Sequence, residues 1–134
     1  MSKSMKMSGS YLLDTNIVIA FYEGEPKLVK KIVGSEIYLP YVVIGELRYG
    51  AEKSGRKSSN QKQIDALVEQ VTVLPGSATT AKHYGVIKSQ LKKKGRPIPE
   101  NDIWIASIAK EYDLILVTRD DHFSHIEGIK QEAW

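Results

Sequence analysis

The sequence predicts an α/β fold in which a central, mostly parallel sheet of about four to five strands is flanked by helices. Two observations lead to this prediction. Short apolar runs alternate with segments whose apolar residues recur at helical spacing. In addition, 134 residues with 42% hydrophobic content are enough for one core but leave little room for a second. We therefore expect a single domain over residues 11–134, preceded by a disordered extension over residues 1–10.

The first half of the chain begins with an apolar run at residues 11–13, which predicts a strand ending at Asp14. Thr15 or Asn16 is then expected to cap the following helix. Asn60 is expected to cap a later helix, after a polar loop. The remaining predicted elements of this half are helices over residues 26–33 and 40–53 and strands over residues 37–39 and 71–74.

In the second half, Ser77 is expected to cap a long helix. Residues 95–99 contain two prolines and are expected to form a loop. The helix expected over residues 100–112 is apolar on nearly every side, so it is either buried on two faces or used as a dimer contact. Residues 114–118 form the clearest strand of the sequence, and a short last strand is expected near Ile129.

The composition excludes several kinds of protein. The chain has no cysteine, so it has no disulfide, thiolate zinc site, iron–sulfur cluster or cysteine nucleophile. No apolar run approaches the roughly 20 residues that a membrane-spanning helix needs, and the first ten residues lack the apolar segment of a signal peptide. We therefore expect a cytoplasmic protein that does not act at a membrane.

Acidic residues follow two of the predicted strands. Asp14 comes directly after the first strand, and Asp120 and Asp121 come shortly after the strand over residues 114–118. Ligand sites of parallel α/β folds lie beyond the carboxyl ends of the strands, which makes these residues candidates for a site. Each of them could also serve only as a turn residue or helix cap.

Two further acids lie within or at the start of apolar helices. Glu46 is one helical turn from Val42 and Val43, so it should border the core, where an acid is costly without a cation. Asp102 begins the most apolar helix, where it could also be a favourable charge on the helix dipole. A partner such as Arg48 would make Glu46 purely structural.

Gathered in one place, Asp14, Glu46, Asp102 and Asp120 would repel one another, and bound cations would make the cluster tolerable. Oxygen ligands in a chain without cysteine indicate Mg²⁺ or Mn²⁺, which usually share their coordination with a phosphate. Such an ion lowers the pKa of a bound water for attack on a phosphodiester. The four acids therefore predict phosphodiester hydrolysis.

Basic residues gather in two runs. Residues 48–62 hold five basic side chains against one acidic side chain, and residues 88–96 hold five basic side chains and no acidic one. Segregated positive charge favours a polyanion as the ligand, although each run could also be a solvated helix end or loop. The side chains expected to contact RNA are Arg48, Arg56, Lys57, Lys92, Lys93, Lys94 and Arg96.

Four segments in this order resemble the PIN-domain ribonucleases, and among them the VapC-type toxins of bacterial and archaeal toxin–antitoxin pairs. They are Leu-Leu-Asp-Thr-Asn at residues 12–16, Gly-Glu-Leu-Arg-Tyr-Gly at residues 45–50, Asn-Asp-Ile-Trp-Ile-Ala at residues 101–106 and Leu-Val-Thr-Arg-Asp at residues 116–120. The resemblance covers nearly the whole chain from residue 11 to residue 134.

This resemblance implies an endoribonuclease that depends on Mg²⁺ or Mn²⁺, with Asp14, Glu46 and Asp102 as its main acids and Asp120 as the fourth. It implies that Thr15, Asn16 and Thr118 support these acids through hydrogen bonds. It also implies a homodimer and a cognate antitoxin protein that blocks the acidic pocket.

The chain departs from the family pattern after residue 120. Many relatives carry an acid directly before the phenylalanine, whereas this chain has Asp121 and His122 before Phe123. Asp121 is therefore the alternative to Asp120 as the fourth acid.

Other functions remain open from the sequence. A haloacid-dehalogenase-like phosphatase would use Asp14 as a nucleophile, but it needs a second Asp where Asn16 stands. A non-catalytic RNA-binding or regulatory module would use the basic runs alone and would bind RNA equally well in the presence of chelators. Catalysis by histidine would require the distant His83 to meet His122 and His125, which we do not expect.

Overall fold

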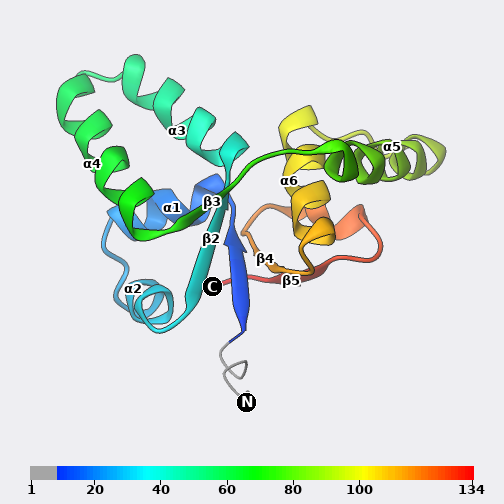
Figure 1. Ribbon diagram of the computed structural model, residues 1–134, viewed down its shortest axis with the longest axis horizontal. Coiled ribbons are helices and arrows are strands. Elements are labelled where there is room, and N and C mark those ends of the chain that lie inside the picture. Colours follow the sequence, from blue (N-terminus) through cyan, green and yellow to red (C-terminus); the bar gives the residue numbers. More distant parts are fainter. Residues whose placement is uncertain (1–8) are drawn as a thin grey trace.

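The structure, a computed structural model, describes residues 9–134. Five parallel strands form one sheet in the order β3-β2-β1-β4-β5, which confirms the predicted α/β class (Figure 1). Residues 1–8 of the expected extension lie outside the described residues, whereas Ser10 already belongs to the first strand. The strands are β1 (Ser10–Leu13), β2 (Glu36–Pro40), β3 (Thr72–Leu74), β4 (Ile115–Val117) and β5 (Lys130–Glu132).

The centre of the sheet is β1, which pairs with β2 on one side and β4 on the other. Leu12 lies opposite both Tyr38 and Leu116, and Leu12 and Leu116 are completely buried. The ladder between β1 and β4 continues by one bond beyond β1, because the Asp14 N–H donates to the Val117 carbonyl at 3.0 Å. The backbone of Asp14 is therefore held by the central strands.

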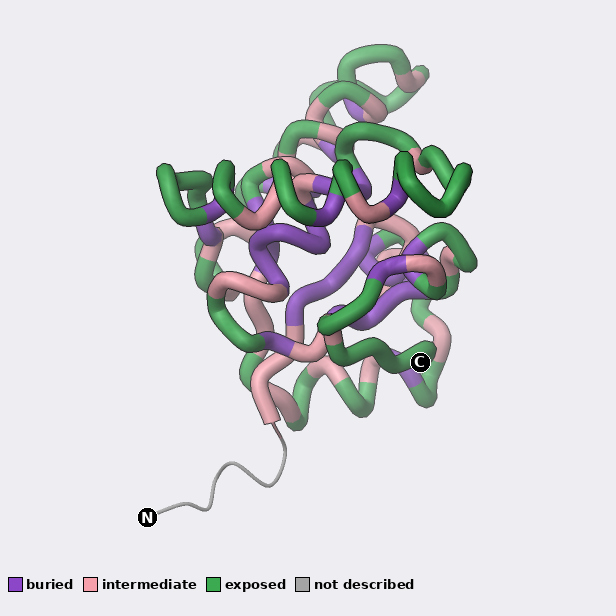
Figure 2. The backbone as a smooth tube through the Cα atoms, turned by 90° about the vertical axis from the view of Figure 1, so that its right-hand side faces the viewer, coloured by how far each residue is buried: buried purple, intermediate pink, exposed green. Residues whose placement is uncertain are grey.

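Within residues 9–134, six α-helices flank the sheet. They are α1 (Thr15–Tyr22), α2 (Pro26–Val33), α3 (Tyr41–Glu52), α4 (Lys57–Gln70), α5 (Ala78–Lys93) and α6 (Glu100–Glu111). In Figure 1 the α3–α4 pair and the α5–α6 pair lie on opposite sides of the view, and the two pairs touch through α3 and α6. Figure 2 shows that the buried segments gather in the interior, beneath the exposed outer turns of the helices.

The helix predicted to be apolar on nearly every side is α6, and it is buried on two faces as expected. Ile105, Ala106 and Ile108 are completely buried, and α6 contacts α5, α3 and β4. Trp104 stacks on Tyr84 of α5, with their ring centroids 4.0 Å apart. The first turn of α6, which carries Asp102, is therefore fixed by packing against several elements.

Two predicted helix starts are wrong. Asp14, rather than Thr15 or Asn16, caps α1, because its side chain accepts a hydrogen bond from the Thr15 N–H. The fourth helix begins at Lys57, before Asn60, whose side-chain amide reaches back to the Ser54 hydroxyl at 3.0 Å. None of the helices within residues 9–134 combines the length and apolarity that crossing a lipid bilayer requires.

Candidate metal centre

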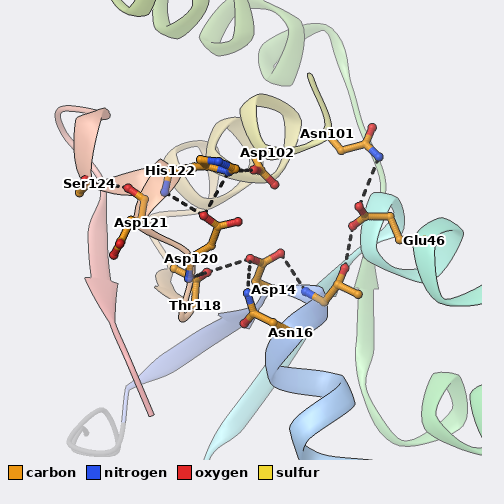
Figure 3. Close-up of polar contacts among 11 residues, drawn as sticks. Asp14, Asn16, Glu46, Asn101, Asp102, Thr118, Asp120, Asp121, His122 and Ser124 are labelled. Carbon is orange, nitrogen blue, oxygen red and sulfur yellow. Dashed lines mark hydrogen bonds and ion pairs between the residues drawn. The ribbon is translucent and has the colours of Figure 1, made fainter. Parts of the chain in front are cut away.

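The four predicted acids come from four different places in the chain and meet at the carboxyl-terminal edge of the sheet. Asp14 follows β1, Glu46 lies in α3, Asp102 lies in the first turn of α6, and Asp120 precedes the short 3-10 helix η2 (Asp121–His125). Figure 3 shows their side chains around a common space. The structure thus brings together residues that are up to 106 positions apart.

Asp14 is the most buried of these acids, with 4% of its surface exposed. One carboxylate oxygen accepts the Thr15 N–H at 2.8 Å, and the other accepts the Thr118 hydroxyl at 2.8 Å and the Asn16 amide at 3.2 Å. Burial raises the pKa of Asp14 to about 6, although the bonds from Thr118 and Thr15 lower it. The charges of the neighbouring Asp102 and Glu46 carboxylates act in the same direction as burial and are smaller contributions to this pKa.

Glu46 is linked to Asp14 through one residue. The Thr15 hydroxyl donates to Glu46 Oε1 at 2.6 Å, while the Thr15 N–H donates to Asp14. The Asn101 amide approaches Glu46 Oε2 at 3.5 Å. Thr15, Asn16 and Thr118 thus all donate to the acids that they were expected to support.

Asp102 and Asp120 share a histidine. The Nδ1 atom of His122 lies 3.0 Å from Asp102 Oδ2 and 3.1 Å from Asp120 Oδ1, and the His122 N–H donates to Asp120 Oδ1 at 2.9 Å. Burial raises the pKa of Asp102, against the lowering effect of the His122 hydrogen bond. The bond to Asp102, followed by the charges of both acids, raises the pKa of His122.

Sequence reasoning assigned no role to His122. Its position two residues after Asp120 and directly before Phe123 is the signal for it in the sequence, and the approach to Asp102 arises from the turn at η2. Asp121, the alternative fourth acid, is exposed and does not belong to the group formed by Asp102, Asp120 and His122. Asp120 is therefore the better placed of the two acids.

In the described part of the chain, His122 is the one basic side chain paired with these acids. Within residues 9–134, no lysine or arginine forms an ion pair with Asp14, Glu46, Asp102 or Asp120. Buried carboxylates without a cation are unfavourable, and their oxygens are the ligands that Mg²⁺ and Mn²⁺ prefer. Within the described residues, the ligand atoms that lie within 4.8 Å of one another are those of Asp102, Asp120 and His122, so this part of the cluster fits a divalent cation, whereas Asp14 and Glu46 lie outside that group.

Several of the predicted RNA-contacting side chains are engaged within the protein. Arg48 donates to Asp65 and Gln61 of α4, both at 2.8 Å, so it joins α3 to α4. Lys57 pairs with Glu52 at 2.9 Å, and Lys94 pairs with Glu127 at 2.6 Å. Four others are exposed and form no ion pair within the described part of the chain, namely Arg56, Lys92, Lys93 and Arg96.

Comparison with known proteins supports the family suggested by the sequence motifs. The profile of the PIN domain matches residues 11–129, nearly all of the described chain. The chain therefore belongs to the PIN-domain family, which confirms the resemblance stated above.

Within that family, the chain is similar to ribonucleases named VapC. It is 32% identical over 130 residues to ribonuclease VapC1 of Haemophilus influenzae (strain R2866), covering 92% of this chain and 97% of that protein. It is 34% identical over 128 residues to the tRNA(fMet)-specific endonuclease VapC of Shigella flexneri, with the same coverage. The crystal structure of VapBC2 from Rickettsia felis bound to a promoter DNA fragment superimposes with a TM-score of 0.87 at 30% identity, covering 93% of this chain and 98% of that one.

Family membership decides between the functions that the sequence left open. A PIN domain does not favour a haloacid-dehalogenase-like phosphatase, for which the chain also lacks the second Asp at position 16. A purely RNA-binding module is not favoured either, because the similar VapC proteins are named for nuclease activity.

Proposed function

We propose that this chain is the toxin of a toxin–antitoxin pair, a divalent-metal-dependent endoribonuclease that hydrolyses RNA phosphodiester bonds. The chain is a PIN-domain nuclease. The observation that supports a metal-dependent reaction is the group of buried and half-buried carboxylates at the sheet edge that no lysine or arginine of residues 9–134 neutralises.

The residues proposed to hold the ion and to carry catalysis are Asp14, Glu46, Asp102 and Asp120. When bound there, Mg²⁺ or Mn²⁺ would supply positive charge beside the scissile phosphate and lower the pKa of an attacking water. The surrounding side chains fix the carboxylates in advance. Thr15 orients Asp14 and Glu46 together, and Thr118 donates to Asp14 while its oxygen accepts the Asp120 N–H at 3.0 Å.

We propose RNA as the substrate, and transfer RNA as its first candidate, because the similar Shigella flexneri protein is named for tRNA(fMet). An acidic centre repels the phosphate backbone, so basic side chains near it are needed to hold the strand. The best candidates are those without an ion pair inside the described chain, Arg56, Lys92, Lys93 and Arg96. Arg48, Lys57 and Lys94 can contribute less, since each already has an acidic partner.

Two protein partners belong to this proposal. One is a cognate antitoxin, supported by the similarity to the VapBC2 structure. The other is a second copy of the chain. Exposed apolar surface on Tyr41 and Tyr49 of α3 and on Val86 of α5 supports this homodimer. Light scattering of the purified protein would measure its molar mass and so its oligomeric state.

The cytoplasmic location expected from the sequence stays a prediction.

The decisive experiment replaces one acid without changing its shape. Asp14→Asn and Asp102→Asn are assayed with a transfer RNA pool in Mn²⁺, and we expect cleavage to fall by about 100-fold or more, because each change removes a charge that faces the ion. Asp113→Asn is the matched control, since Asp113 pairs with Lys130 on the exposed surface. Cleavage that persists in either site variant, or that EDTA leaves unchanged in the wild-type protein, would contradict the proposal.

A further inference from the structure

His122 lies among the proposed ligands and plays no part in the proposed function. Its Nδ1 atom is 3.0 Å from Asp102 Oδ2 and 3.1 Å from Asp120 Oδ1. One ligand atom from each of the three residues lies within 4.8 Å of the others. Figure 3 shows the imidazole between the two carboxylates.

These distances match the spacing of ligands on one metal ion. An octahedral ion with metal–ligand bonds of about 2.1 Å holds neighbouring ligand atoms about 3.0 Å apart. The two nitrogen–oxygen separations at His122 agree with this value, so Nδ1 is spaced from each carboxylate oxygen as neighbouring ligands of one ion are.

The local structure aims His122 at the site. The side chain of Asp120 caps η2 by accepting the His122 N–H, which ties the two residues together. Phe123 is completely buried and anchors the turn from the opposite side. The His122 side chain keeps 47% of its surface exposed, so it borders solvent on the open side of the acids.

We propose that His122 is a metal ligand alongside Asp102 and Asp120, and that its nitrogen makes the site prefer Mn²⁺ or another first-row transition ion over Mg²⁺. This inference rests on the proposed metal-dependent function and specifies which ion that function uses. Carboxylate oxygens suit Mg²⁺, whereas imidazole nitrogen is a ligand typical of transition metals. His122 directly precedes Phe123 and contacts two of the proposed ligands, Asp102 and Asp120.

Pulsed electron paramagnetic resonance of the Mn²⁺-loaded wild-type protein tests this directly, because a coordinated imidazole nitrogen modulates the Mn²⁺ signal. We expect this nitrogen coupling in the wild-type protein and in His125→Gln, the matched control from the same turn. We expect it to be absent in His122→Gln, together with a drop of about 10- to 100-fold in Mn²⁺ affinity by calorimetry. Mg²⁺ affinity should change much less, and His122→Asp should shift the preference of the site toward Mg²⁺.

The outcomes separate this inference from the proposed function. Bound Mn²⁺ without nitrogen coupling in the wild-type protein would show that His122 is only a hydrogen-bond donor, which overturns the inference and leaves the nuclease proposal standing. Nitrogen coupling that persists in His122→Gln would assign the ligand to another histidine and overturn the inference as well. Failure of the wild-type protein to bind Mn²⁺ while it still binds Mg²⁺ would overturn the inference alone, whereas failure to bind either ion would overturn both proposals.

Discussion

Two groups of carboxylates in this chain have different surroundings. On the outer surface, six carboxylates each lie within 3.0 Å of a lysine or arginine nitrogen. They are Glu25, Glu52, Asp65, Glu100, Asp113 and Glu127. At the sheet edge, Asp14, Glu46, Asp102 and Asp120 instead receive hydrogen bonds from hydroxyl, amide and backbone groups and from His122.

This difference between the two groups shows that the four acids at the sheet edge carry negative charge that no lysine or arginine of residues 9–134 compensates. Neutral donors orient a carboxylate without cancelling its charge, whereas a lysine or arginine would do both. Burial raises the pKa of Asp14 and of Asp102, and the charges of neighbouring carboxylates act in the same direction, so the site is unfavourable as an isolated group. The chain therefore maintains a local cost in stability at the place where a cation would remove it.

The largest effect that tests this comparison is the pH dependence of the metal-free protein. Because the pKa of Asp14 is about 6 in the fold and about 3.9 in the unfolded chain, folding favours the protonated acid. The contribution of Asp14 is thus most favourable below about pH 4 and is lost as pH rises through 6, by up to about 3 kcal/mol. We expect the difference in unfolding free energy between the wild-type protein and Asp14→Asn to show this fall.

The measurement is urea unfolding in EDTA from pH 4 to pH 8. Asp113→Asn, which changes an exposed and paired acid, should produce a difference that is nearly independent of pH above 5. A difference between the wild-type protein and Asp14→Asn that does not vary with pH would show that burial of Asp14 is not costly, and the contrast between the two groups would fail.

A smaller effect is expected from Thr118→Val, which keeps the shape of the side chain and removes its hydroxyl. Thr118 is buried and joins Asp14 to the backbone of Asp120. Leaving buried polar groups unpaired costs about 1–3 kcal/mol, and losing a residue that orients a ligand weakens metal binding by about 10- to 100-fold. Urea unfolding and Mn²⁺ calorimetry measure the two effects, and Thr79→Val on the exposed face of α5 is the control. Unchanged Mn²⁺ affinity in Thr118→Val would mean that neutral donors do not prepare the site.

The smallest expected effect is a change in RNA binding when basic side chains without an ion pair are compared with one that has an acidic partner. Lys92 and Lys93 form no ion pair within residues 9–134, whereas the adjacent Lys94 pairs with Glu127. Replacing Lys92 and Lys93 together by Gln should weaken RNA binding and reduce its logarithmic salt slope by about 1.4, since each contact to a single strand contributes about 0.7. Lys94→Gln should change the slope less. Equal slopes in the wild-type protein and the double variant would place this run outside the RNA path.

Much of the site could be predicted from the sequence because its acids lie at positions that topology controls. Asp14 follows an apolar run that is too short for anything but a strand, and parallel strands present their carboxyl ends at one edge. Asp102 opens the most apolar helix, which had to be buried. For Asp14 and Asp102, the local sequence pattern predicts the element that positions each acid, and the folded chain places both carboxylates at the carboxyl edge of the sheet.

The parts that could not be predicted depend on side chains that reach across the fold. Arg48 belongs to a basic run in the sequence, but its partners Asp65 and Gln61 lie on another helix, and no local pattern reveals them. Thr15 has the residue type of a helix cap, yet its hydroxyl binds Glu46, 31 positions away, and Asp14 caps the helix instead. The proximity of His122 to Asp102 is likewise a tertiary contact between residues 20 positions apart.

The buried ring of Phe123 connects the proposed metal site to the hydrophobic core. Phe123 is completely buried, its carbonyl accepts the Gln131 amide at 2.6 Å, and it directly follows His122. The completely buried side chain of Phe123 thus fixes the position of the turn that carries Asp120 and His122. Truncation of Phe123 should therefore lower the stability of the fold and displace Asp120 and His122 together, because the same buried ring supports the core and this turn.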